Sequence, residues 1–116
     1  MIKEASEHFV TALSAKPALI PLYKNKEMIC EINGNEERVW LHFHDGSCQL
    51  MLTEPDHVDV TLSGDSGCIA SLLRGADRLM RMEEEGRITA NGSLRYLLSL
   101  ESLFVLTGET SPILHN

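Results

Sequence analysis

The chain has 116 residues, enough for one domain with its own hydrophobic core but too few for two. Its formal net charge of -7 argues against nucleic acid and anionic membrane surfaces as partners, because both bind through clustered Lys and Arg. Three cysteines without CxxC spacing indicate reduced thiols rather than a disulfide framework. The sequence shows no signal peptide and no transmembrane segment, so we expect a cytoplasmic protein.

The first 24 residues are predicted to be helical. Residues 2–15 have the spacing of an amphipathic helix, with Phe9 on its apolar face. Pro17 and Pro21 frame a short apolar segment that fits one turn of helix, since proline is tolerated at the first helical position.

Four strands are expected within residues 26–62, the last of them from His57 to Leu62. The first three form a meander, because Asn33-Gly34-Asn35 and Asp45-Gly46 are residues that accept positive φ in tight turns. A two-residue turn at Asp45-Gly46 fixes the second hairpin. The register then gives the apolar pairs Val39 with Leu52, Leu41 with Leu50 and Phe43 with Cys48 on one face.

The opposite face of this meander also carries apolar side chains. Trp40 faces Met51 in the second hairpin, and pairing Glu31 with Arg38 in the first hairpin places Ile29 opposite Trp40. An exposed row of Ile29, Trp40 and Met51 is typical of a partner surface. One interpretation of the chain is therefore a protein-interaction module with a filled core and no ligand, which forms a homodimer through this row.

The second half is predicted to contain helices, a short strand and a final helix. Asp65 is the expected N-cap of the helical region 65–85. Alternating residues between two glycines indicate a fifth strand at 86–92. Ser93 then caps a strongly apolar helix at 93–106, and residues 107–116 form a tail.

This arrangement of glycines and leucines resembles the sterol carrier protein type-2 family. In that family a strand between two glycines leads into a helix that ends in Leu-Phe, and another glycine lies upstream. The matching positions here are Gly75, Gly86, Ile88, Ala90, Gly92, Leu94, Leu103 and Phe104. The spacing matches without a gap, and the resemblance extends from Met28 to Phe104.

The resemblance implies an α/β (α+β) domain with a five-stranded, mostly antiparallel sheet, helices on one face, and an apolar cavity between them. It also implies non-catalytic intracellular binding or transfer of a fatty acid, acyl-CoA, phospholipid or sterol-like lipid, without a cofactor. The apolar side chains expected to contact such a lipid are Leu72, Leu79, Met80, Met82, Leu97, Leu98, Leu100, Leu103 and Phe104. From periodicity alone, a plain packed core fits equally well.

The sequence departs from the family pattern at Glu83 and Glu84, where the family has apolar residues close to the tunnel. A carboxylate cannot line an apolar tunnel unless it is paired or neutralised. Three alternatives follow: the turn swings outward, the cavity is smaller, or the ligand has a cationic or hydroxylated end.

The sequence offers no catalytic constellation, because Gly-rich phosphate loops and Ser-His-Asp signatures are absent, and we expect no enzyme. His42 and His44 lie two apart on one strand face and could share a metal. No third ligand is visible, so a solvated strand face without metal is the favoured interpretation. Cys30, Cys48 and Cys68 fall on inward or helix-buried positions, where a free thiol acts as a small apolar side chain.

Overall fold

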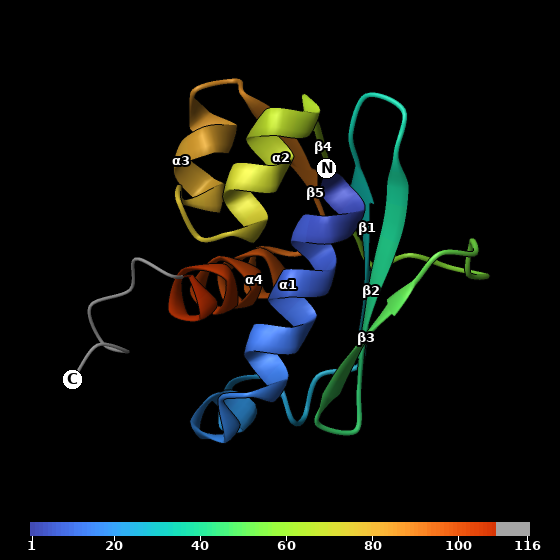
Figure 1. The fold of residues 1–116 in the computed structure, drawn as a ribbon, viewed down its shortest axis with the longest axis vertical. Helices are drawn as coiled ribbons and strands as arrows, with labels where there is room; N and C mark the ends of the chain where they lie inside the picture. Colours follow the sequence, from blue (N-terminus) through green and yellow to red (C-terminus); the bar gives the residue numbers. More distant parts are fainter. Residues whose placement is uncertain (109–116) are drawn as a thin grey trace.

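The computed structural model describes residues 1–108 and consists of a five-stranded sheet with its helices on one side (Figure 1). The strands are β1 (Met28–Asn33), β2 (Arg38–His44), β3 (Ser47–Met51), β4 (Val60–Gly64) and β5 (Ile88–Asn91). Their order is β3-β2-β1-β4-β5, with β1 and β4 parallel and every other neighbouring pair antiparallel. The predicted α+β fold with a mostly antiparallel sheet is confirmed.

The helical layer is built from the N-terminal segment and from the second half of the chain. Its members are α1 (Ile2–Ser14), the 3-10 helix η1 (Pro17–Leu22), α2 (Ser66–Leu73), α3 (Leu79–Glu84) and α4 (Leu94–Thr107). Most of the predicted tail, residues 109–116, lies outside the described residues. None of the helices within residues 1–108 has the length and apolar run that crossing a bilayer requires.

Side-chain caps start two of these helices, as the sequence predicts. The Asp65 carboxylate accepts a hydrogen bond from the backbone amide of Gly67 at 3.0 Å. The Ser93 hydroxyl accepts one from the amide of Tyr96 at 3.2 Å. Each cap satisfies an amide that has no partner within its own helix, so α2 and α4 begin where these residues lie.

The hairpin between β2 and β3 has the predicted two-residue turn. Asp45 and Gly46 both have positive φ, 50° and 74°, as a type I′ turn requires. Leu41 therefore lies opposite Leu50, and Phe43 opposite Cys48. This register gives the sheet the apolar inner face on which the helices pack.

The hairpin between β1 and β2 has a different register from the predicted one. Glu31 lies opposite Trp40 rather than Arg38, and Ile29 lies opposite His42. The predicted register was wrong by two residues because the turn is centred on Asn35 and Glu36, one residue further along the chain than Gly34 and Asn35: the amide of Gly34 donates to the carbonyl of Glu37 at 2.9 Å. An even shift keeps every side chain on its face, so Ile29 and Trp40 still share the outer face but are not directly opposed.

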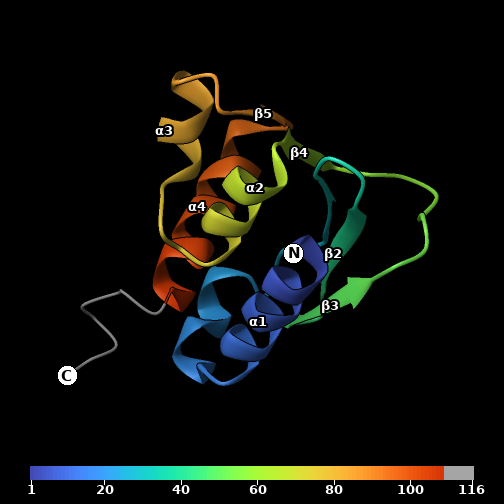
Figure 2. The same ribbon diagram turned by 45° about the horizontal axis from the view of Figure 1, so that its top comes forward.

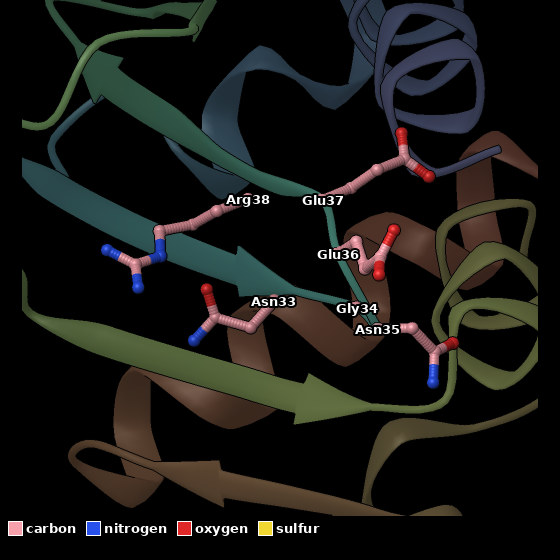
Figure 3. A pocket seen from close by; sticks show the side chains of 6 residues that line it. All are labelled: Asn33, Gly34, Asn35, Glu36, Glu37 and Arg38. Atoms are coloured by element: carbon pink, nitrogen blue, oxygen red, sulfur yellow. The ribbon is translucent and has the colours of Figure 1, made fainter.

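The turn between β1 and β2 also holds the first turns of two helices. The Glu37 carboxylate accepts hydrogen bonds from the amides of Ile2 at 3.0 Å and Lys3 at 3.2 Å. Asn35 exchanges hydrogen bonds with Ser66 at the start of α2. Figure 3 shows these side chains extending from the turn. They line a pocket of about 360 Å³ together with Asn33, Gly34, Glu36 and Arg38. A pocket with this lining does not suit an apolar ligand.

The parallel pairing of β1 and β4 joins the meander to the second half of the chain. Cys30 lies beside Val60 and Ile32 beside Leu62. The fourth strand begins at Val60 rather than His57. Residues 52–59 form an irregular connection whose last residue, Asp59, bonds to the backbone of Ile29 on β1. This segment, lime green in Figure 2, projects from the side opposite the helices.

Candidate functional site

The residues expected to contact a lipid come together on the inner side of α2, α3 and α4. Seven of the nine are buried: Leu72, Leu79, Met82, Leu97, Leu100, Leu103 and Phe104. Met80 is half-buried and packs against the hydrophobic core. Leu98 is 46% exposed and faces away from this set.

An aromatic cluster connects this set to the sheet. The ring of Phe104 on α4 contacts that of Phe9 on α1 edge to face, with centroids 5.0 Å apart. Phe9 also contacts Phe43 on β2 at 6.5 Å, and Phe43 contacts Tyr23 at 5.9 Å. The space between α4 and the sheet is thus occupied by side chains. Phe9 was missed as a candidate site residue, although its place on the apolar face of the first helix was predicted.

A groove of about 200 Å³ opens at the junction of α3 and α4. It is lined by Arg78, Glu101, Ser102, Val105 and Leu106. Leu106 also packs against the hydrophobic core, so this groove adjoins the buried apolar set. Sequence reasoning missed it, because Arg78 and α4 are brought together only by tertiary packing. The sequence did offer one indication of the groove, because the spacing of Glu101, Ser102 and Val105 places them on one face of a helix.

Glu101 holds the two helices together beside this groove. Its carboxylate accepts a hydrogen bond from the backbone amide of Met80, the second residue of α3, at 2.9 Å. This bond satisfies one of the free amides at the start of α3. One oxygen of Glu101 is therefore engaged in this bond. Arg78, which is exposed, is the cationic residue among those that line the groove.

Glu83 and Glu84 are both exposed at the end of α3. Their neighbour Met82 is fully buried, because the helix turns one side chain inward and the next two outward. Of the three alternatives left open by the sequence, the outward position of the carboxylates is the observed one. The inner face of α3 remains apolar.

No protein-family model and no curated protein matches this sequence. Among solved structures, the UbiJ-SCP2 ubiquinone synthesis protein superposes with a TM-score of 0.70 and 16% identity. The match covers 88% of this chain and 86% of that one. A sterol carrier protein 2 superposes with a TM-score of 0.66 and 13% identity, over 91% of this chain and 95% of the other. The chain has the sterol carrier protein 2 fold.

A part of one larger enzyme also has a fold similar to that of this chain. The stereoselective inverting sec-alkylsulfatase Pisa1 from Pseudomonas sp. matches with a TM-score of 0.61 and 15% identity. That match covers 80% of this chain but only 15% of the sulfatase. At these identities the likenesses establish the fold alone.

The face of the sheet opposite the helices exposes less apolar surface than the sequence predicted. Trp40 is only 4% exposed and Ile29 only 8%, and Met51 is half-buried. The expectation of an exposed apolar row was therefore wrong for two of its three members. A homodimer through Ile29, Trp40 and Met51 stays a prediction, without the exposed patch that motivated it.

The same outer face brings a third potential metal ligand to the two histidines noted in the sequence. Glu27, His42 and His44 each offer one ligand atom, and the three atoms lie within 4.8 Å of one another. Glu27 was missed because it precedes β1 and is far from the histidines in the sequence. It lies one residue before Met28, which pairs with Phe43, so continuing the register places it beside His44.

Two of the three thiols are buried in the core. Cys30 is fully buried, and burial raises its pKa far above the ordinary value. Burial also raises the pKa of Cys48 to about 12. Both therefore stay protonated at neutral pH and act as apolar side chains, as predicted. Cys68 is half-buried.

Proposed function

We propose that this chain binds, and passes on, a lipid whose apolar chain lies between α4 and the sheet. The observation that carries the proposal is the position of Leu106, which lines the α3–α4 groove and also packs against the hydrophobic core. A hydrocarbon chain entering the groove would therefore meet apolar side chains continuously. The proposed contacts are Leu72, Leu79, Met80, Met82, Leu97, Leu100, Leu103 and Phe104. Leu98, on the exposed side of α4, is a further proposed contact.

Binding would draw on burial of the hydrocarbon chain, which contributes about 0.8 kcal/mol for each CH2 removed from water. The chain would have to displace packing such as the contact between Phe9 and Phe104. Met80 and Met82 favour such an exchange, because unbranched thioether side chains repack at small cost. We therefore expect tolerance of several acyl chains rather than a narrow preference.

The groove favours an anionic head group. Arg78 is exposed at its rim, whereas the carboxylate of Glu101 is already bonded to the amide of Met80. A guanidinium can bind a carboxylate or phosphate through paired hydrogen bonds. A fatty acid, acyl-CoA or phospholipid fits this arrangement better than a cationic lipid. Because one structural neighbour is described as a ubiquinone synthesis protein, a polyprenyl lipid belongs in the test panel.

The proposal can be tested with a tryptophan placed at the proposed site. The native Trp40 lies on the outer face, so a Met80→Trp variant in a Trp40→Phe background reports from the helical side instead. A brominated fatty acid quenches indoles at short range. We expect it to quench the tryptophan at position 80 and to leave Trp40 of the wild type unchanged. Equal quenching at both positions, or none at either, would count against the site.

A pair of leucine substitutions provides a matched control. Leu106 is half-buried at the groove, whereas Leu52 is 54% exposed in the segment before β4. Leu106→Glu should weaken binding of a fluorescent fatty acid at least about tenfold, because the carboxylate must be desolvated beside the hydrocarbon chain. Leu52→Glu should leave the affinity unchanged. Circular dichroism shows whether each variant is folded, and equal affinities in folded variants would rule out this route of entry.

A further inference from the structure

We propose that Glu27, His42 and His44 form a binding site for a divalent transition-metal ion, with Zn²⁺ as the best match. The site lies on the outer face of the sheet, opposite the helices. It is therefore independent of the proposed lipid site. The three residues are partly exposed, with side-chain exposures of 69%, 27% and 50% in the order given, so an ion can reach them without rearrangement of the core.

The fold positions these side chains through strand geometry. His42 and His44 are two residues apart on β2 and so point to the same face of the sheet. Their rings stack, with centroids 5.4 Å apart and planes inclined by 28°. Glu27 enters from the neighbouring chain segment, immediately before β1. The pairing of β1 with β2 therefore sets which side chains lie near one another.

The interatomic distances are close to those of a zinc site. Glu27 Oε1 lies 2.7 Å from Nδ1 of His44 and 3.8 Å from Nε2 of His42. Zinc bonds of about 2.0–2.2 Å in tetrahedral geometry hold ligand atoms about 3.3 Å apart. The three ligand atoms lie within 4.8 Å of one another, so binding would require rotation of these partly exposed side chains to reach this separation. The ion would take the place of the hydrogen bond between Glu27 and His44.

The ligand types indicate which ion fits. Two imidazole nitrogens and one carboxylate oxygen suit Zn²⁺ and its neighbours among the later transition metals, whereas Mg²⁺ and Ca²⁺ prefer all-oxygen sites. Three protein ligands leave one tetrahedral position open to water or to a further ligand. The site therefore has the composition of an exchangeable surface site rather than a closed structural one.

Asp45 supplies the outer support that zinc-bound histidines usually have. Its Oδ2 lies 3.0 Å from Nε2 of His44, the ring nitrogen that does not face Glu27. A carboxylate at this nitrogen fixes the ring so that Nδ1 is presented to the ion. Asp45 is held in turn by the tight turn with Gly46, where it has a φ of 50°. We therefore assign Asp45 as a positioning residue and not as a ligand.

Calorimetric titration of the full chain, first stripped with a chelator, tests the proposal. We expect Zn²⁺ to bind with one-to-one stoichiometry and Mg²⁺ not to bind. His42→Gln, His44→Gln and Glu27→Gln should each lower the affinity for Zn²⁺ by about 100-fold or more. Loss of a ligand should thus cost more than loss of a group that only supports a ligand, such as Asp45. His57→Gln is the matched control, because His57 is exposed on the segment before β4, and it should bind as the wild type does.

Two further measurements separate this site from adventitious binding. In ¹⁵N spectra of the histidine rings, Zn²⁺ should shift Nδ1 of His44 and Nε2 of His42 and leave His57 unmoved. Asp45→Asn keeps the turn, since Asn also adopts positive φ, and should weaken binding about 10–100-fold. Asp56→Asn should have no effect. The proposal is overturned if the wild type does not bind Zn²⁺, or if the ligand variants bind as tightly as His57→Gln.

Discussion

Trp40 on β2 donates its indole Nε1–H to the carboxylate of Glu31 on β1 across 3.0 Å. The other oxygen of Glu31 accepts from Asn33 Nδ2, also at 3.0 Å. Asn33 Nδ2 in turn lies 3.2 Å from the hydroxyl of Ser63 on β4. One carboxylate thus links side chains of three neighbouring strands on the outer face of the sheet. Trp40, expected in an exposed apolar row, is thus a buried indole within a polar network.

Replacing Glu31 with Leu should destabilise the protein by about 1–3 kcal/mol, because the indole N–H of Trp40 is left buried without an acceptor. Glu31→Gln, which keeps an acceptor oxygen, should cost less. Urea unfolding followed by circular dichroism measures both, and equal losses in the two variants would show that the hydrogen bond contributes nothing specific.

The three thiols should differ in reactivity. Cys68 is half-buried, whereas Cys30 and Cys48 are buried with raised pKa values, and only the thiolate reacts with iodoacetamide. We expect native protein to be alkylated at Cys68 first, and the other two to react only after unfolding. Peptide mapping by mass spectrometry identifies the labelled residue. Labelling of Cys30 at the rate of Cys68 would contradict the packing described here.

Gly34→Ala should destabilise the turn between β1 and β2. A Cβ at this position would collide with Cδ1 of Ile2 and lie 2.6 Å from the hydroxyl of Ser66, so the side chains at the starts of α1 and α2 would have to shift, that of Ile2 within the core. Overpacking of this kind costs about 1–3 kcal/mol. Gly67→Ala at the start of α2 is the control, because its Cβ meets only the Asp65 side chain at 3.2 Å and should change stability by less than about 1 kcal/mol. Equal unfolding midpoints for the two variants would refute the collision.

Stability should fall in acid partly through Glu37. The pKa of its carboxyl is lowered from the ordinary 4.5, chiefly because the carboxylate accepts hydrogen bonds from the amides of Ile2 and Lys3. A lowered pKa in the folded state stabilises the fold above pH 4.5, and this contribution is lost as pH falls through the lower folded value. Glu37→Gln should therefore be less stable than wild type at pH 7, with the difference shrinking in acid. Urea unfolding at neutral and at acidic pH measures this difference. A constant difference would mean that ionisation of Glu37 does not matter.

Local signals in the sequence predicted much of the fold. Asp45-Gly46 fixes one hairpin register, since few other residues accept positive φ at both positions of a tight turn. Ser93 and Asp65 mark helix starts through hydrogen bonds that span only two or three residues. The first hairpin lacks such a two-residue signal. Its register depends on the partner of Trp40 and on contacts of the turn with α1 and α2, which are tertiary interactions.

The candidate sites were harder to predict, because they too depend on tertiary interactions. Burial of Leu97, Leu100, Leu103 and Phe104 followed from the density of apolar residues on α4, although Leu94 and Leu98 of the same helix are exposed. The groove beside Arg78 arises only when α3 packs against α4. Glu27 could not be connected to His42 and His44 before the register of the first hairpin was known, because pairing decides which residue of one strand faces another.

The hydrogen bonds that Glu37 and Asn35 make with the first turns of α1 and α2 give the two ends of the helical layer unequal freedom. At the end near the β1–β2 turn, the helices are fastened to the sheet by backbone amides. At the end where α3 meets α4, the contact described here is one between helices, from the amide of Met80 to Glu101. If the space between the helices and the sheet widens when a ligand enters, we therefore expect the separation to increase at α3 and α4, and the starts of α1 and α2 to stay bound to the β1–β2 turn.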